Sequence, residues 1–448
     1  MSSLKFQFVT GVAGLLFLVV TNAQEINATL KITPLPEPLT LKYALSLAQD
    51  QHPSLQRVNA NIQRALASEQ SIDAGDDLTV RLEGQVRWVG PPDISPDQTN
   101  DDHRLSLIAS KTLYDFGRQD SRQSAASDDV ESQRLSYQEA VQEHHVLVMR
   151  RFFDVLLADL KFYRYNEEMA VAYIQYDRMK QRRRLKQAID VDVLKLETEY
   201  QKVRRLRFNA EAMQRQTRAK LAAILNHPGQ LPSTLAPPEL PILKTKLPEV
   251  EGLQELALKH NLRLRVLRKK LAAVQQRELV AQRTYGPTLT GTVEAHAYTR
   301  KLGSSDSWRA GVTLDVPLYT GDRTHALVAE VKANEYELQS QIKELEYNIS
   351  QAVLETWLNI DTLRIQRQEM KTRADYEDTA LDQSRSLYEL EIKSDLGMAM
   401  VNVSEAAFQV KQTDYAMAVA WERLKLLTGQ LDSDLDKQTI STPGDKHE

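Results

Sequence analysis

The residue types that most often carry chemistry are sparse and scattered in this chain. There is no cysteine, so disulfides, thiolate metal sites and cysteine nucleophiles are excluded. His144 and His145 are the one adjacent histidine pair, and neighbouring positions on a helix point apart, which does not suit a shared metal ion. A His-Glu-x-x-His signature, a phosphate-binding loop and a nucleophile elbow are all missing. The sequence predicts no enzyme, no metal site and no cofactor.

Composition favours long helices. Hydrophobic residues make up 42% of the 448 positions, and the 16 Gly and 16 Pro are few, since helix interiors exclude both types. The net charge of -4 lacks the basic excess of a nucleic-acid binder, so no nucleic-acid partner is expected.

The first 23 residues resemble a secretory signal peptide. Lys5 precedes an apolar run over residues 9–20, and small residues follow up to a plausible cleavage point after Ala23. The alternative is a short membrane anchor, but the run is shorter than the roughly 20 residues that a membrane helix needs. We therefore expect an exported protein.

Two halves of the sequence repeat the same pattern. The segment LYDFGR at Leu113–Arg118 corresponds to LYTGDR at Leu318–Arg323, and each segment precedes a long helical stretch. Each half reads as helix, strand, strand, long helix, turn and shorter helix, which indicates a tandem duplication. The predicted organisation is signal peptide 1–23, first repeat 24–226, proline-rich linker 227–251, second repeat 252–430 and polar tail 431–448.

Four segments alternate between apolar and polar residues, as strands do. They cover about 78–90, 103–116, 286–299 and 308–319, and Ile108 is an exception that falls on a polar face. Each has about the length of a tilted transmembrane strand, and Trp88 and Trp308 border the interstrand loops, where an aromatic girdle would lie. Four strands cannot close a barrel, so three chains contributing twelve strands are the economical solution.

The helical parts predict two long hairpins, over 118–226 and 322–429. From Arg118 to about Lys186 the chain lacks Pro and Gly, which corresponds to about 100 Å of helix. Each returning arm is about half as long, and the helices before the strands, Pro53–Asp73 and Leu253–Arg283, supply the missing length. The expected fold is therefore mainly α with a β-barrel part.

This ordered set of motifs resembles the TolC family of outer-membrane efflux and secretion channels. The two segments at 113–118 and 316–323 look like the family's strand-to-helix junction, and Tyr285-Gly-Pro287 looks like its helix-to-strand junction. The first-repeat counterpart of that junction, Asp73–Leu78, lacks the proline. The resemblance implies a homotrimer with a twelve-stranded barrel in outer-membrane lipid and a long periplasmic tunnel. It also implies a periplasmic adaptor and an inner-membrane transporter as partners.

The resemblance places a pore constriction where the long helices turn back, over 186–194 and 388–397. Ala188 and Glu391 stand where the family usually has glycine, while Gly397 and Met400 stand where pore-lining aspartates would fall. Acids from one turn earlier, or the neighbouring lysine, could line the pore instead. The candidates are Asp190, Asp192, Asp395 and Lys393. Helix capping is the alternative role for these aspartates.

Arg182, Arg183 and Arg184 precede the first turn, where they could contact the adaptor or form a gating salt bridge, or simply form a solvated face.

We expect an outer-membrane channel of a tripartite export system for drugs, small molecules or proteins. The alternatives are a type I secretion duct of the same fold and a periplasmic coiled-coil adaptor or scaffold without a barrel.

Overall fold

The computed structural model describes residues 35–47, 52–91, 93–94, 98–230, 233–300, 306–390 and 395–430. Contacts divide the chain into two units, Met1–Leu35 and Pro36–Glu448, and the description below concerns the second. The expected signal peptide and polar tail lie outside the described residues.

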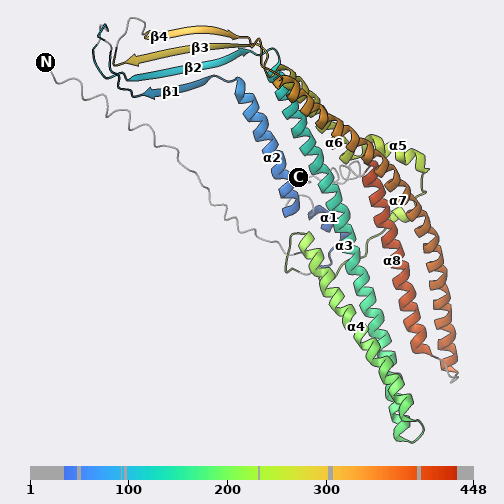
Figure 1. The fold of residues 1–448 in the computed structure, drawn as a ribbon. Helices are drawn as coiled ribbons and strands as arrows, with labels where there is room; N and C mark the ends of the chain where they lie inside the picture. Colours follow the sequence, from blue (N-terminus) through green and yellow to red (C-terminus); the bar gives the residue numbers. More distant parts are fainter. Residues whose placement is uncertain are drawn as a thin grey trace, which may run out of the picture. The chain divides into compact units, whose positions relative to one another are not determined.

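The four strands form one antiparallel sheet in the order β1-β2-β3-β4 (Figure 1). They are β1 (Thr79–Gln85), β2 (Arg104–Tyr114), β3 (Thr288–Tyr298) and β4 (Trp308–Asp315). β1 is shorter than the segment expected from alternation, because its pairing with β2 stops at Gln85 opposite Arg104. Beyond that point Trp88 forms only an isolated bridge with Asp101.

Directly paired residues share a face of the sheet, so the register defines two faces. Leu82, Leu107 and Ala295 lie in one row, and this face is mainly apolar. Ile108 lies opposite Arg81 and Glu294 on the polar face, where its place in the alternation puts it. Val80 and Leu82 are each 61% exposed, and every residue of β1 and β4 is exposed. No other element of the described chain covers the apolar face.

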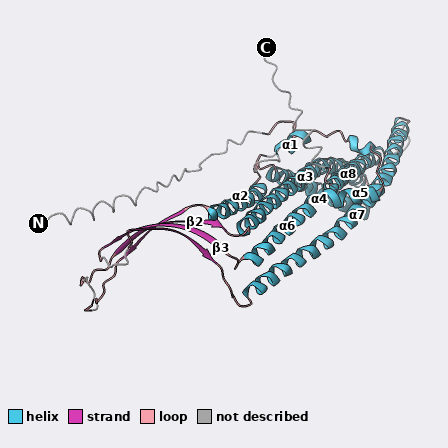
Figure 2. Cartoon of the chain, turned by 90° about the horizontal axis from the view of Figure 1, so that it is seen from above, coloured by secondary structure: helices cyan, strands magenta, loops and turns pink. Residues whose placement is uncertain are grey.

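Helices account for most of the described chain, which confirms the mainly α expectation (Figures 1 and 2). α3 and α7 each have 67 residues, and α4 and α8 have 35 and 33. No helix in the described ranges is long and apolar enough to cross a membrane. The helical elements are α1 (Leu41–Leu47), α2 (Pro53–Asp73), η1 (Ala74–Asp76), α3 (Arg118–Arg184), α4 (Asp190–Ile224), η2 (Pro241–Lys244), α5 (Val250–His260), α6 (Leu262–Arg283), α7 (Arg323–Glu389) and α8 (Leu396–Thr428).

Each long helix packs against several shorter ones. α3 contacts α2, α4, α6 and α8, and α7 contacts α5, α6 and α8. In Figure 1, α2 lies beside the end of α3 that is nearer the sheet, and α4 lies beside the opposite end. α2 and α4 therefore pack one after the other along α3.

The helix expected over Leu253–Arg283 is wrong as one element, because the chain bends at Asn261 between α5 and α6. Asn261 has φ −57° and ψ 125°, outside the helical range, and its Oδ1 accepts a hydrogen bond from Leu264 N at 3.2 Å. Its amide also donates to Leu427 O at 3.1 Å, which fixes the bend against the end of α8. α5 begins at Val250, within the segment expected to be the linker.

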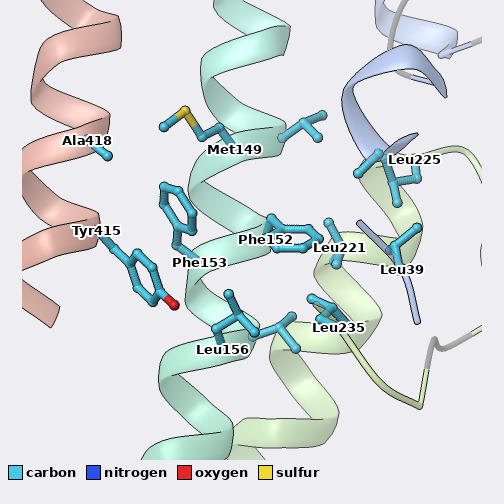
Figure 3. Close-up of a cluster of buried hydrophobic side chains, with 13 residues drawn as sticks. Leu39, Met149, Phe152, Phe153, Leu156, Leu221, Leu225, Leu235, Tyr415 and Ala418 are labelled. Carbon is cyan, nitrogen blue, oxygen red and sulfur yellow. The ribbon is translucent and has the colours of Figure 1, made fainter. Parts of the chain in front are cut away.

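The main core lies midway along α3 (Figure 3). Phe152 is fully buried, and Phe153 stacks on Tyr415 of α8 with centroids 4.4 Å apart and planes 5° from parallel. A second core forms between α5, α6, α7 and α8, and it includes Met417 and Trp421. Since α8 supplies residues to both cores, it joins the two halves of the chain.

Candidate functional site at the ends of the helical hairpins

The first hairpin turns tightly between α3 and α4. Lys186 has the left-handed φ of 60°, and its N–H donates to Arg183 O at 2.9 Å. Gln187 N donates to Arg182 O at 2.8 Å, so two of the orphan carbonyls at the helix end are satisfied. Ile189 is the N-cap of α4 but makes no side-chain capping bond, so Asp190 and the acids after it begin the helix rather than cap it.

The turn brings Arg183 and Asp190 together. The Arg183 Nε and Asp190 Oδ1 atoms form an ion pair across the turn, and both side chains are more than half exposed. Within the described residues Arg182 and Arg184 form no ion pair, and both are exposed. Asp192 lies exposed in the first turn of α4, where the helix dipole favours a negative charge. The end of this hairpin thus carries an internal ion pair and unneutralised charges of both signs.

Exposed apolar side chains surround these charges, and sequence analysis overlooked them. Leu185, Ile189, Val191 and Leu194 are each at least 60% exposed. The signal for three of them was present in the segment KQAIDVDVL, where apolar residues recur next to charged ones and Val193 is buried. Arg182, Arg184, Lys186 and these four apolar residues are called the tip surface below.

The second hairpin end assigns a different role to Asp395. This residue is the N-cap of α8, and its Oδ1 accepts a hydrogen bond from Met398 N at 3.3 Å. Gly397 packs so closely on α3 that a Cβ atom would lie 2.9 Å from Val171 Cγ2, so larger residues do not fit without a shift. Lys393 and Glu391 lie outside the described residues.

Polar contacts tie the two hairpins together above their ends. Arg164 Nε of α3 lies 2.6 Å from Glu405 Oε2 of α8, and Ser404 donates a hydrogen bond to Glu167. Within the first hairpin, Asp159 accepts bonds from both terminal nitrogens of Arg218, at 2.6 and 2.8 Å. Side chains on three helices therefore hold the hairpin ends in place.

The two histidines of the adjacent pair face different neighbours. His144 packs against His52 with ring centroids 4.7 Å apart, whereas Lys425 of α8 faces His145. Burial, followed by the nearby His52, lowers the pKa of His144 to about 4, and burial with Lys425 and His144 lowers the pKa of His145 to about 4. No cluster of three or more potential metal ligands occurs in the part of the chain that the structure describes.

Comparison with known proteins identifies the fold. Residues 253–430 match the family model of the outer membrane efflux protein. Comparison with curated protein sequences finds no significant match.

Three solved structures illustrate the structural similarity. The CmeC outer membrane channel of Campylobacter jejuni is 13% identical, with a TM-score of 0.74 over 89% of each chain. A membrane protein from Pseudomonas aeruginosa is 16% identical, with a TM-score of 0.72 over 87% of this chain and 90% of that one. The MtrE outer membrane channel of Neisseria gonorrhoeae, in its open state, is 16% identical, with a TM-score of 0.67 over 87% and 89%. Residues 253–430 thus match the outer membrane efflux protein family, and the chain as a whole has the fold of these outer-membrane channels.

Proposed function

We propose that the protein is the outer-membrane channel of a tripartite export system, a passive duct rather than an enzyme. The family match over residues 253–430 and the fold support this role. The observation that carries it is the sheet, whose apolar face and two outer strands are uncovered by the residues that the structure describes. Such a sheet needs both an apolar environment and further strands.

Three copies of the chain would close the sheet into a barrel of twelve strands. β1 and β4 are the two outer strands, and neither has a second strand partner in the described chain. The face carrying Val80, Leu82 and Val312 would contact lipid, and the face carrying Arg81, Glu294 and Arg309 would line the channel. This division matches the apolar outside and polar inside of membrane barrels.

The helices would extend from the barrel into the periplasm as a tunnel. Their far ends would meet a periplasmic adaptor, which in turn would connect to an inner-membrane transporter. The tip surface supports this contact, because exposed apolar side chains together with arginines such as Arg182 and Arg184, which form no ion pair among the described residues, are typical of protein interfaces. Arg183 is less available, since it already pairs with Asp190.

The pore would be narrowest at the hairpin ends, with Asp190, Asp192, Asp395 and Lys393 as the proposed lining. Three copies of an aspartate form a ring of like charges that attracts cations. Asp192 is the strongest of these candidates, because Asp190 pairs with Arg183 and Asp395 caps α8.

Replacing Asp192 alone by Ala should reduce cation selectivity in planar bilayers, and replacing Asp395 alone should have a smaller effect. Equal selectivity in the wild type and both variants would remove these residues from the pore lining.

The first experiment is to fractionate cells that express the protein and to measure the mass of the detergent-solubilised species. The expected result is a trimer in the outer-membrane fraction that resists carbonate extraction. A monodisperse monomer, or release by carbonate, would contradict the channel and favour a periplasmic scaffold.

A further inference from the structure

Two arginines hold the junction between β2 and α3: Arg283, whose Nη1 donates to Gly117 O at 2.9 Å, and Arg118. Arg118 Nη1 donates to Thr284 O at 3.0 Å, and Nη2 donates to Thr288 Oγ1 at 3.2 Å. Asp115 faces its Nε at 3.5 Å, and the side chain is only 16% exposed. Arg118 therefore fastens the start of α3 to the neighbouring junction, where α6 ends and β3 begins.

The second half of the sequence has an arginine in the corresponding position. The segment LYTGDR places Arg323 at the start of α7, as LYDFGR places Arg118 at the start of α3. Within the described chain, however, the Arg323 side chain is exposed and makes no hydrogen bond or ion pair. The residues before it are also uncovered, since Leu318 is 94% and Tyr319 91% exposed.

The strand registers identify the residues that Arg323 would contact. Thr79 pairs with Ser110, and Thr288 pairs with Asp315. Ser110 and Asp315 lie equally far before Arg118 and Arg323, so Thr79 is the counterpart of Thr288. Counting back the same number of residues makes Gly75 the counterpart of Thr284. Both Gly75 and Thr79 are exposed at the junction between α2 and β1.

The charges at the two surfaces are complementary. The junction between α2 and β1 contains Asp73, Asp76 and Asp77, and the first and last of these are exposed. Arg323 is a planar donor that suits carbonyl, hydroxyl and carboxylate oxygens. It cannot reach its counterpart site within its own chain, because β1 and β4 are at opposite edges of the sheet.

We propose that Arg323 binds the junction between α2 and β1 of the next copy of the chain. Its guanidinium would donate to the Gly75 carbonyl oxygen and the Thr79 hydroxyl of that copy, as Arg118 does to Thr284 and Thr288 within one chain. This inference rests on the proposed oligomer and specifies how its copies join.

The same correspondence fixes the register between copies. Ile108 pairs with Glu294 in the internal contact, and their counterparts are Thr313 of β4 and Gln85 of β1. Thr313 of one copy would therefore lie opposite Gln85 of the next. This register keeps Val312 and Leu314 on the same face as Leu82 and Val86, so the apolar face remains continuous across the interface.

Cysteine cross-linking tests the register, because the natural chain has no cysteine. The variant with Thr313→Cys and Gln85→Cys should form covalent trimers under mild oxidation, since directly opposite strand residues lie within disulfide range. The control with Thr313→Cys and Arg81→Cys, displaced by two pairs on the same face, should stay uncross-linked. Cross-linking of the control but not the first variant would overturn the register. A trimer that neither variant cross-links would overturn it while leaving the proposed channel intact, whereas a monomer would contradict both.

Arg323→Ala tests the arginine itself. The trimer should dissociate at a temperature roughly 5 °C lower, with unchanged helix content in the monomer. His325→Ala is the control, since His325 is a neighbour on the same helix and 90% exposed. Arg323→Lys should recover only part of the loss, because an ammonium cannot reproduce the planar donor fork. A dissociation temperature that Arg323→Ala leaves unchanged would overturn the proposed contact.

Discussion

Both the helical core and the sheet carry apolar side chains that must be removed from water, but only the helical core buries them within one copy. Around Phe152 the chain buries its apolar side chains against its own helices, and both faces of the contact are supplied within one copy. In the sheet, Leu82 and Leu107 align on one face, and no element of the described part of the chain lies over them. The helical core is complete in one copy, whereas in the proposed channel lipid and further copies would cover the sheet.

This difference separates two contributions to stability. Packing inside the helical core should govern whether a single copy keeps its helices folded. The apolar face and the outer strands should govern insertion and assembly. Substitutions in the two regions should therefore change different measurements.

The largest effect is expected in the helical core. Phe152→Ala removes a fully buried ring and should destabilise the helices by about 3–5 kcal/mol, through lost burial and the cavity left behind. The measurement is the midpoint of thermal unfolding followed by far-ultraviolet circular dichroism.

Phe208→Ala is the matched control, because this phenylalanine of α4 is 68% exposed. An equal loss of thermal stability in both variants would contradict the assignment of the core around Phe152 to the stability of a single copy.

The next largest effect is expected on the apolar face of the sheet. Leu107→Arg places a charge midway along β2, where a lipid-facing arginine costs about 2–4 kcal/mol. Thr292→Arg places the same charge on the polar face of β3, where water would solvate it. Only Leu107→Arg should reduce the amount of trimer in the outer-membrane fraction. Equal amounts for both variants would contradict the assignment of the faces.

Acid should destabilise the helical part by a smaller amount. Burial is the main reason that the pKa of His144 is lowered to about 4 from the ordinary histidine value of 6.5. Between these values the unfolded chain binds a proton that the folded chain does not, so this stability is full above pH 6.5 and falls as pH decreases towards 4. At pH 5 the loss is about 2 kcal/mol for this ring.

Thermal unfolding of the helices at neutral pH and near pH 5 measures this loss. His144→Gln removes the titrating group and should make the midpoint less dependent on pH. The same dependence in wild type and variant would assign acid sensitivity to other residues, of which buried His145 is the first to test.

Much of the architecture follows from local signals in the sequence. Alternation in the strands, with Ile108 as its exception, agrees with the register of the sheet. The resemblance to the TolC family is confirmed by the family match and the solved structures. These features depend on periodicity and on residues near each other in sequence, which a single chain displays directly.

Some details could not be predicted from the sequence, because they depend on contacts between residues that are far apart along the chain or in other copies. The pairing of Arg183 with Asp190 depends on the left-handed backbone at Lys186. Glycine is the usual sequence signal for such a backbone, and this turn has none. The bend at Asn261 is fixed by its contact with Leu427, which is far along the chain. The helical periodicity of the sequence runs through Asn261 without a break, so the sequence predicted one helix there. The pore-lining role of the aspartates stays a prediction, because it concerns several copies at once.

The smallest effect on stability is expected for an ion pair that joins two helices, compared with an ion pair on the surface of one helix. Asp159 is 20% and Arg218 16% exposed, and their two bonds join α3 to α4. Asp159→Asn should lower the stability of the helical part by about 1 kcal/mol, because a neutral amide cannot accept both guanidinium bonds. Asp382→Asn should have an effect near zero, because Asp382 pairs with Arg385 on the exposed surface of α7 at 3.7 Å and solvent screens such pairs.

Thermal unfolding of both variants, compared with wild type, measures this difference in stability. Equal midpoints would mean that the contact between α3 and α4 depends on apolar packing alone, and would sharpen the contrast between the self-sufficient helical core and the uncovered sheet.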